Sequence, residues 1–304
     1  MIRVVPGGTP ALILAAAMAG ALGCTSSYES AWDQQPSGQS GGESADASRH
    51  DALVAQGDAA WGGRDDGDRG RAASAAWEQA GEADAGDYET LAKLSRGYYF
   101  LADGHLRFDD PDALAETHQI GIQRAEQALA VINPEFAQRM AAGELFENVV
   151  GMLDERAVPA LYWRASNLGR WARNEGFATL LSYKDEVRAV MARCLELERY
   201  YYFAGPDRYF GAFFSIAPSY AGGDLERSRE HFEESIRRQP DYFGTRVLMA
   251  ETYAVQAQDR DVYQTQLQYV IDGDPEALAP VAPENRVEQR KAREMLAEID
   301  DLFE

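Results

Sequence analysis

Hydrophobic residues recur at helical spacing almost everywhere after residue 51. One apolar face ends at Asn133-Pro134 and consists of His118, Ile122, Ala125, Leu129 and Ile132. Another lies near the end of the chain and consists of Ala292, Met295, Leu296, Ile299, Leu302 and Phe303. Spacings of three and four place side chains on one face of an α-helix, and the alternation typical of strands is almost absent. Because prolines fall between such segments, the pattern predicts an all-α fold.

The segment 228–253 shows the strongest internal regularity. The second helix of a TPR unit has small, aromatic and small residues at spacings of four and three, followed by a proline five positions later. These positions are occupied by Ser228, Phe232, Ser235 and Pro240, and the next helix offers Ala250 and Tyr253 in register. The same small–aromatic–small spacing recurs at Ala73, Trp77 and Ala80. Small residues let two helices approach closely while the ring fills the gap between them, so Phe232 and Tyr253 should meet in one junction. We predict an α-solenoid of degenerate TPR-like helix pairs over residues 51–304.

The turn Gly222-Gly223-Asp224 precedes one of these helices. Asp224 is suited to cap the helix, because its carboxylate can accept hydrogen bonds from the free amides of the first turn. Anion binding at the same helix end is the alternative, but a carboxylate at the cap repels anions. We therefore favour the capping role.

The N-terminal stretch is predicted to be a lipoprotein signal peptide, residues 1–23. Its apolar run, Ala11–Leu22, is short for a membrane span and stops at Gly23-Cys24. This ending resembles a bacterial lipobox, in which the chain is cut before the cysteine and the cysteine carries the lipid, including palmitate. We expect Cys24 to be the lipidation site of a periplasmic protein anchored to a bacterial membrane. By resemblance to proteobacterial lipoproteins, Thr25 after the cysteine favours the outer membrane. A plain signal peptide with an incidental cysteine is the alternative.

Residues 24–50 are rich in Ser, Gly, Gln and Glu and show no apolar period. Such a composition predicts a flexible tether between the lipid and the helical domain of residues 51–304.

The charge of the chain excludes some partners. Its 50 acidic residues outnumber 29 basic ones, for a net charge of −21. That charge repels phosphate backbones and anionic lipid headgroups, so we expect no nucleic-acid partner and membrane contact only through the lipid anchor. If Cys24 is acylated, Cys194 is the single remaining cysteine and no intramolecular disulfide can form. Its helical apolar neighbours, Val190 and Met191, predict a small buried side chain.

No catalytic constellation appears in the sequence. The four histidines, at positions 50, 105, 118 and 231, have no metal-ligand spacing. The chain contains neither a G-x-S-x-G elbow nor a phosphate-binding loop. We therefore expect no enzyme activity, no cofactor and no metal, and we expect His118 to be a hydrogen-bonded core residue.

Eight aromatic residues are concentrated between positions 200 and 214, and they are Tyr200, Tyr201, Tyr202, Phe203, Tyr209, Phe210, Phe213 and Phe214. Four consecutive rings cannot face one core from a regular helix, because each residue turns by 100°. With Gly205, Pro206 and Gly211 among them, the segment is predicted to be a long ordered loop. The rings either line a cavity or partner surface or simply pack the loop onto the array. The separate group of Tyr162, Trp163 and Trp171 is predicted to be core.

Several blocks in the same order resemble one known family. These blocks are Val158–Ala172, Gly205–Gly211, Gly222–Phe232, Pro240–Tyr242, Glu251–Asp261 and Gln289–Phe303. Together they resemble the T component associated with TRAP-type transporters, a periplasmic lipoprotein of the TatT type. The resemblance extends over about residues 51–304 and is strongest after Val158.

The resemblance implies a fold of cryptic TPR-like motifs and self-assembly into a small ring, with a trimer as the expected form. It also implies association with a periplasmic solute receptor, the P subunit of a TRAP-type transporter. Members of this family are thought to conduct apolar small molecules through an opening in each protomer. The eight aromatic residues of the segment 200–214 are our candidates for lining that passage.

Two functions of different classes are compatible with the sequence. The first is an accessory component of solute uptake that docks a solute receptor and offers it an apolar passage. The second is a ligand-free TPR scaffold lipoprotein in envelope or outer-membrane assembly. A ligand that co-purifies with the protein would favour the first.

Overall fold

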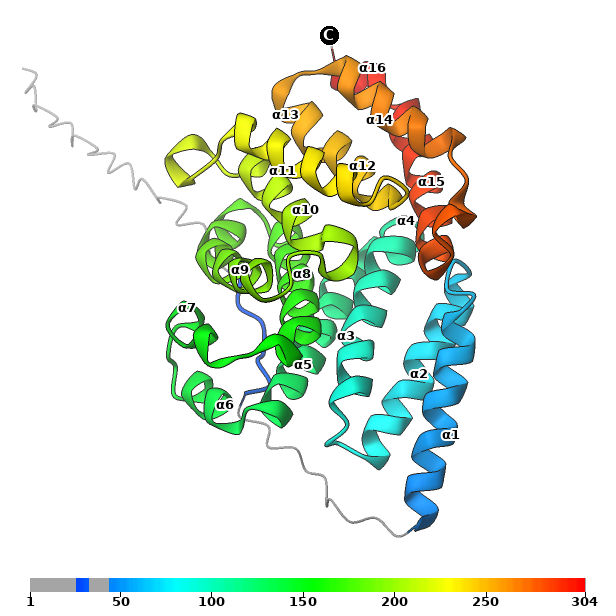
Figure 1. Ribbon diagram of the computed structural model, residues 1–304, viewed down its shortest axis with the longest axis vertical. Coiled ribbons are helices and arrows are strands. Elements are labelled where there is room, and N and C mark those ends of the chain that lie inside the picture. The colour runs from blue at the N-terminus through cyan, green and yellow to red at the C-terminus, as the bar shows by residue number, and fades with distance from the viewer. Residues whose placement is uncertain (1–25, 33–43, 304) are drawn as a thin grey trace, which may run out of the picture.

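Successive α-helices pack side by side in the computed structural model, which describes residues 26–32 and 44–303 (Figure 1). The helices of the first half are α1 (Ser44–Trp61), α2 (Gly67–Ala83), α3 (Tyr88–Leu101), α4 (Arg107–Asp109), α5 (Leu114–Ile132), α6 (Pro134–Ala141) and α7 (Phe146–Val149). The helices of the second half are α8 (Val158–Asn174), α9 (Phe177–Leu197), α10 (Tyr201–Ile216), α11 (Leu225–Arg238), α12 (Phe243–Leu248), α13 (Val255–Ala257), α14 (Arg260–Asp272), α15 (Ala282–Ala297) and α16 (Ile299–Leu302). The described ranges contain no strand, and the predicted all-α fold is confirmed.

Shorter helical segments join these elements. A π-helical segment, Ala102–Leu106, makes α3 and α4 continuous, and a second one, Met249–Ala254, does the same for α12 and α13. The 3₁₀ segments are Pro111–Ala113, Val150–Met152, Glu155–Ala157, Ser219–Ala221 and Pro275–Val281. No helix of the described ranges combines the length and the apolar composition that a membrane span requires.

Most of the long helices pack against the next long helix along the chain. The series runs from α1 through α2, α3, α5 and α8 to α9, and it continues in the pairs α10–α11 and α14–α15. Figure 1 shows that α15 then returns to the loop between α1 and α2, so these two parts of the chain lie side by side. Ion pairs join them there: Arg286 of α15 donates to Asp65 at 2.7 Å.

The junction predicted around Phe232 is confirmed. Phe232 on α11 is fully buried and forms one cluster with Ala212, Met249 and Tyr253. Asp224 caps α11, since its carboxylate accepts hydrogen bonds from the amides of Glu226 and Arg227. These contacts hold two helix pairs together, while the assignment of the repeats as TPR-like stays a prediction.

The predicted core residues are also confirmed. His118 is buried, and its Nδ1 lies 2.9 Å from Oδ1 of Asn167. Because the Asn167 amide nitrogen already donates to the carbonyls of Ser95 and Trp163, Oδ1 is the acceptor and the imidazole donates. Cys194 is buried as well, and burial raises the pKa of its thiol. These polar groups stabilise the packing and are closed to solvent.

The predicted flexible tether is wrong for the parts of it that the structure describes. Residues 44–50 belong to α1, and the N-terminal segment (residues 26–32) packs into the body of the protein. Tyr28 donates to the buried carboxylate of Glu126 at 2.8 Å, and the Ala31 amide donates to the same group at 2.7 Å. Trp32 contacts Phe136 edge-on. The polar composition concealed one hydroxyl and one amide that pair with a buried charge, and one tryptophan ring that packs in the core. The predicted signal peptide, Cys24 and the rest of the tether lie outside the described residues.

The predicted aromatic loop is wrong too, because most of it is the helix α10. The chain makes one left-handed turn at Tyr202, Phe203 and Ala204, with φ of 43°, 58° and 55°, and then continues as a right-handed helix. Pro206 falls in the first turn of that right-handed part, where the missing amide has no partner to lose. Gly211 faces the ring of Phe232, where a Cβ would come within 2.7 Å. The residues that we took as helix breakers have other roles: Pro206 begins the right-handed helix, and Gly211 allows α11 to approach it.

Candidate functional site

A large apolar pocket opens between α8, α9 and α10. It encloses about 1060 Å³ of unfilled space, part of which is open to solvent. Its apolar walls include Ala165, Gly169, Leu180, Tyr183, Val187, Met191, Tyr209, Ala212 and Phe213. Phe177, 56% exposed, and Ile216 lie among the lining residues and mark the open side of the pocket. Its apolar walls are those of a small-molecule site.

A second, charged pocket adjoins the first and holds about 630 Å³ of unfilled space, which also includes open solvent. The two pockets share five lining residues, which we call the neck, and these are Tyr99, Tyr162, Arg170, Arg208 and Leu248. The neck draws side chains from α3, α8, α10 and α12, so it lies where the first and second halves of the array meet.

Apart from Arg208, the charged side chains of the second pocket form ion pairs. Asp103 contacts Arg170 at 3.2 Å and also accepts a hydrogen bond from Lys291. Burial opposes the ionisation of Asp103, but the neighbouring Arg170 and Lys291 outweigh it and hold the pKa of that carboxyl well below its usual range. Glu251 lies 3.6 Å from Arg170 and 3.2 Å from Arg173, and its pKa is likewise lowered. Asp103 and Glu251 therefore stay ionised and balance the bases around them.

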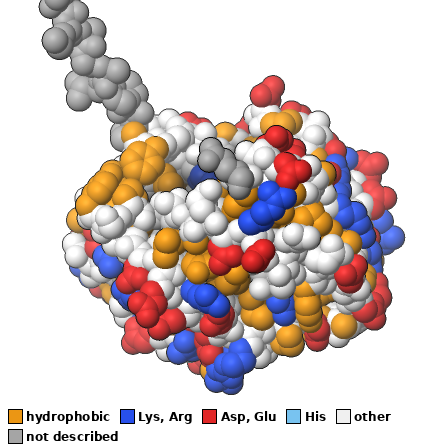
Figure 2. Space-filling model, turned by 90° about the horizontal axis from the view of Figure 1, so that it is seen from above, with side chains coloured by type: hydrophobic (Ala, Val, Ile, Leu, Met, Phe, Trp, Pro, Cys, Tyr) orange, Lys and Arg blue, Asp and Glu red, His pale blue; other side chains and the backbone are white. Residues whose placement is uncertain are grey.

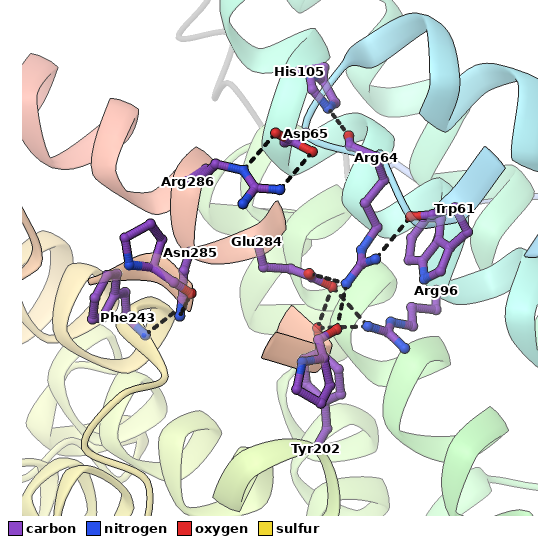
Figure 3. A network of polar contacts seen from close by, with 12 residues as sticks. Trp61, Arg64, Asp65, Arg96, His105, Tyr202, Phe243, Glu284, Asn285 and Arg286 are labelled. Carbon is purple, nitrogen blue, oxygen red and sulfur yellow. Dashed lines mark hydrogen bonds and ion pairs between the residues drawn. The ribbon is translucent and has the colours of Figure 1, made fainter. Parts of the chain in front are cut away.

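One part of this pairing joins distant parts of the chain. Figure 3 shows Glu284 of α15 between Arg64, from the α1–α2 loop, and Arg96 of α3. Arg96 donates to Glu284 at 2.8 Å, and the hydroxyl of Tyr202 donates to the same oxygen at 3.1 Å. Burial disfavours the charge on Glu284, but the two guanidinium groups still lower its pKa. Removing one member would leave a buried charge without its partner, so this network stabilises the closure of the array.

Arg208 differs from Arg170, the other base of the neck. It is 7% exposed, and within the described ranges no ion pair joins it to a carboxylate. Its guanidinium donates to four neutral oxygens: the Tyr162 hydroxyl at 2.8 Å, the Thr245 hydroxyl at 3.3 Å, and the carbonyls of Tyr202 and Phe203 at 3.2 Å. It also lies 4.5 Å from the centre of the Tyr242 ring. The buried positive charge of Arg208 is therefore stabilised by neutral oxygen atoms and by the face of an aromatic ring.

The left-handed turn supplies two of those oxygens. Each of its three non-glycine residues costs about 1–2 kcal/mol relative to a right-handed conformation. Two of the three, Tyr202 and Phe203, turn their carbonyls to Arg208. Backbone strain of this kind persists where the surroundings impose it, and it is concentrated at functional sites.

The structure distributes the eight predicted passage residues among several environments. Tyr209 and Phe213 line the apolar pocket, and Tyr202 lines the charged one. Phe210 and Phe214 are buried against the ring of His231. The others lie away from both pockets: Tyr201 packs on Tyr162, Phe203 stacks on Tyr242, and Tyr200 is 46% exposed beside Arg238.

Sequence reasoning missed most of the pocket wall. The residues from α9, such as Leu180 and Val187, and the bases of the neck were not candidates. One feature of the sequence could have identified Arg208: it is a base within the segment 200–214, which contains eight aromatic residues. A base in such a segment has aromatic rings close to it in any conformation. Tyr162, Trp163 and Trp171 are buried as predicted, although Tyr162 also contributes to the neck. The described residues bring no three His, Cys, Asp or Glu side chains into a metal-binding group.

Comparison with known proteins agrees with this architecture. The family model described as TRAP transporter T-component matches residues 118–303, which include α8–α16 and every base of the neck. A comparison with curated proteins gives no match. The matched region contains the predicted Gly222–Phe232 block and most of the pocket wall. The chain therefore belongs to the TRAP transporter T-component family.

Proposed function

We propose that this TRAP transporter accessory component docks a periplasmic solute receptor and offers it a passage for apolar molecules. The observation that carries the proposal is the apolar pocket between α8, α9 and α10, which shares the five residues of the neck with a second pocket. An open pocket in a well-packed helical array has no structural purpose of its own, since protein interiors normally leave few voids. Apolar walls of this extent suit a ligand whose surface leaves water on binding.

A glycine in the pocket wall allows a direct test. Gly169 on α8 lines the pocket, and the nearest atom to a Cβ placed there is Cγ1 of Val187 at 4.0 Å. The pocket can therefore accept a larger side chain at this position without a backbone clash. Gly81 on α2 is a matched control, because it is also helical, has no atom within 4 Å of a Cβ, and does not line the pocket.

The experiment measures binding of the neutral fluorescent probe N-phenyl-1-naphthylamine to the wild type, to Gly169→Phe and to Gly81→Phe. The proposal expects saturable binding by the wild type and by Gly81→Phe, with a loss of at least about tenfold in Gly169→Phe, since the ring occupies the space. Circular dichroism and thermal melting confirm that both variants fold. Equal binding by the two variants would contradict the passage, and an absence of binding by all three would favour the ligand-free scaffold.

Docking and assembly are separate parts of the proposal. Exposed apolar side chains at the open side of the pocket, Phe177 and Ile216, suit a partner that covers the pocket mouth. A solute receptor should therefore co-purify with the wild type from a periplasmic extract and be lost from a Phe177→Asp variant. Light scattering measures the expected trimer. Retention of the receptor by Phe177→Asp would place the docking surface elsewhere.

We further propose that the protein is periplasmic and is held at a membrane by a lipid on Cys24. The support for this is the apolar run that ends at Gly23-Cys24.

A further inference from the structure

The charges around the apolar pocket are of one sign. The lining includes Arg170, Arg173, Lys184 and Arg208, and no described aspartate or glutamate belongs to it. The chain as a whole has 50 acidic and 29 basic residues, so a random sample of its charged groups would be mainly acidic. Figure 2 shows acidic and basic side chains interspersed on the outer face that it presents. The pocket lining therefore differs in charge from the rest of the protein.

Three of the four bases have carboxylate partners outside the pocket. Arg170 and Arg173 pair with Glu251, and Lys184 pairs with Asp185 at 2.6 Å. Arg208 has only neutral acceptors among the described residues, and it lies in the neck, where it lines both pockets. Its positive charge is buried without a counter-charge, which is costly in an apolar surrounding.

We propose that the apolar pocket binds molecules with an apolar tail and a single carboxylate, and that Arg208 binds the carboxylate at the neck. This inference rests on the proposed passage and names its substrate class. Four of the five N–H groups of Arg208 donate to neutral oxygens, so a carboxylate would accept from Nε and replace one of these neutral acceptors. The exchange is favourable because a charge-assisted hydrogen bond is stronger than one between neutral groups. The tail would lie along the walls formed by Leu180, Val187 and Phe213.

The same geometry disfavours other head groups. An ammonium head would approach four bases and no acid of the pocket lining, so like charges would repel it. A neutral hydroxyl could accept a hydrogen bond from Arg208 but would leave its charge uncompensated. A carboxylate with no tail would lose the apolar contacts, so acetate should bind poorly.

Binding of four ligands to the wild-type protein tests the inference without any substitution. Decanoate, decan-1-ol, decylammonium and acetate are titrated by calorimetry or by displacement of N-phenyl-1-naphthylamine. We expect decanoate to bind at least about tenfold more tightly than decan-1-ol, and decylammonium and acetate to bind more weakly than either. Equal affinity for decanoate and decan-1-ol would overturn the inference and leave the apolar passage intact. If neither binds, both the inference and the passage fail.

Two substitutions then locate the effect. Arg208→Met should remove the preference for decanoate over decan-1-ol, while Arg208→Lys should keep part of the preference because it keeps the cation. Arg229→Met is the control, since it removes an exposed cation that pairs with Glu233 and lies outside the pocket lining. A preference that survives in Arg208→Met, or that is lost in Arg229→Met, would contradict the role of Arg208. Because Arg208 also binds the left-handed turn, thermal melting checks the fold of each variant.

Discussion

Trp32→Ala is the substitution that best separates a packed N-terminal segment from a flexible tether. Trp32 is 8% exposed although it lies in a segment of polar composition. Its ring centre lies 5.6 Å from that of Phe136 and 6.2 Å from that of Phe146. The guanidinium of Arg164 lies 5.3 Å from the same ring. The indole therefore fills a space among three side chains of the main core.

The expected change in the free energy of unfolding follows from the area that the Trp32 side chain buries. A buried tryptophan removes about 200 Å² from water, which at about 25 cal/mol per Å² corresponds to about 5 kcal/mol. The unfolded chain already hides part of that surface, which reduces the figure to about 3–4 kcal/mol. A cavity left beside Phe136 and Phe146 would add to the loss if the segment did not relax. We expect Trp32→Ala to lower the free energy of unfolding by about 3–5 kcal/mol.

Urea denaturation followed by tryptophan fluorescence and by circular dichroism measures this difference. Ser27→Ala is the matched control, because Ser27 is exposed in the same segment and should change stability by less than about 0.5 kcal/mol. A tether that does not pack would make the two variants alike. A change below about 1 kcal/mol for Trp32→Ala would therefore refute the packing of the N-terminal segment, and limited proteolysis near residue 32 would then become fast.

Three further predictions concern the junction, one histidine and the anchor. Gly211→Ala should lower the free energy of unfolding by about 1–3 kcal/mol, because its Cβ would come within 2.7 Å of the Phe232 ring. Gly81→Ala, where the Cβ enters open space, should raise it by up to about 1 kcal/mol. Thermal melting measures both variants. Burial lowers the pKa of His118 to about 4. Since an unfolded imidazole binds its proton near pH 6.5, the wild type should lose about 3 kcal/mol relative to His118→Gln as the pH falls from 6.5 to 4, measured by urea denaturation at each pH. Cys24→Ser should release the protein from the membrane fraction and remove the lipid mass, and continued membrane association would contradict the anchor.

The helices could be predicted from the sequence because their evidence is local and repeated. A face such as that of α11 needs only the spacing of Ser228, Phe232 and Ser235 to be recognised, and all three are buried. The capping role of Asp224 also depends on its nearest neighbours in the chain. These features involve interactions within a few residues, and periodicity and residue type report on such interactions.

The candidate site depends on long-range contacts that no local pattern records. Arg208 becomes unusual only when the fold places Tyr162 and Thr245 around it and pairs it with no described carboxylate. The left-handed turn was hidden for a related reason, since tyrosine and phenylalanine rarely adopt that conformation and the surrounding contacts impose it. The aromatic segment was recognised as exceptional by composition, but its conformation was decided by what packs against it.

The packed N-terminal segment also changes what a lipid on Cys24 would do. Only Thr25 separates Cys24 from Ser26, whose amide donates to Oγ1 of Thr179 at 3.0 Å. Two residues reach at most about 7 Å, so a lipidated cysteine would lie close to the start of α9. That part of α9 includes Phe177, which is exposed and belongs to the lining of the apolar pocket. A long tether would have let the protein lie away from the membrane, whereas this attachment would hold the start of α9 near the bilayer surface. Molecules with an apolar tail are most concentrated in the bilayer, so the anchor and the pocket would act on the same pool of ligand.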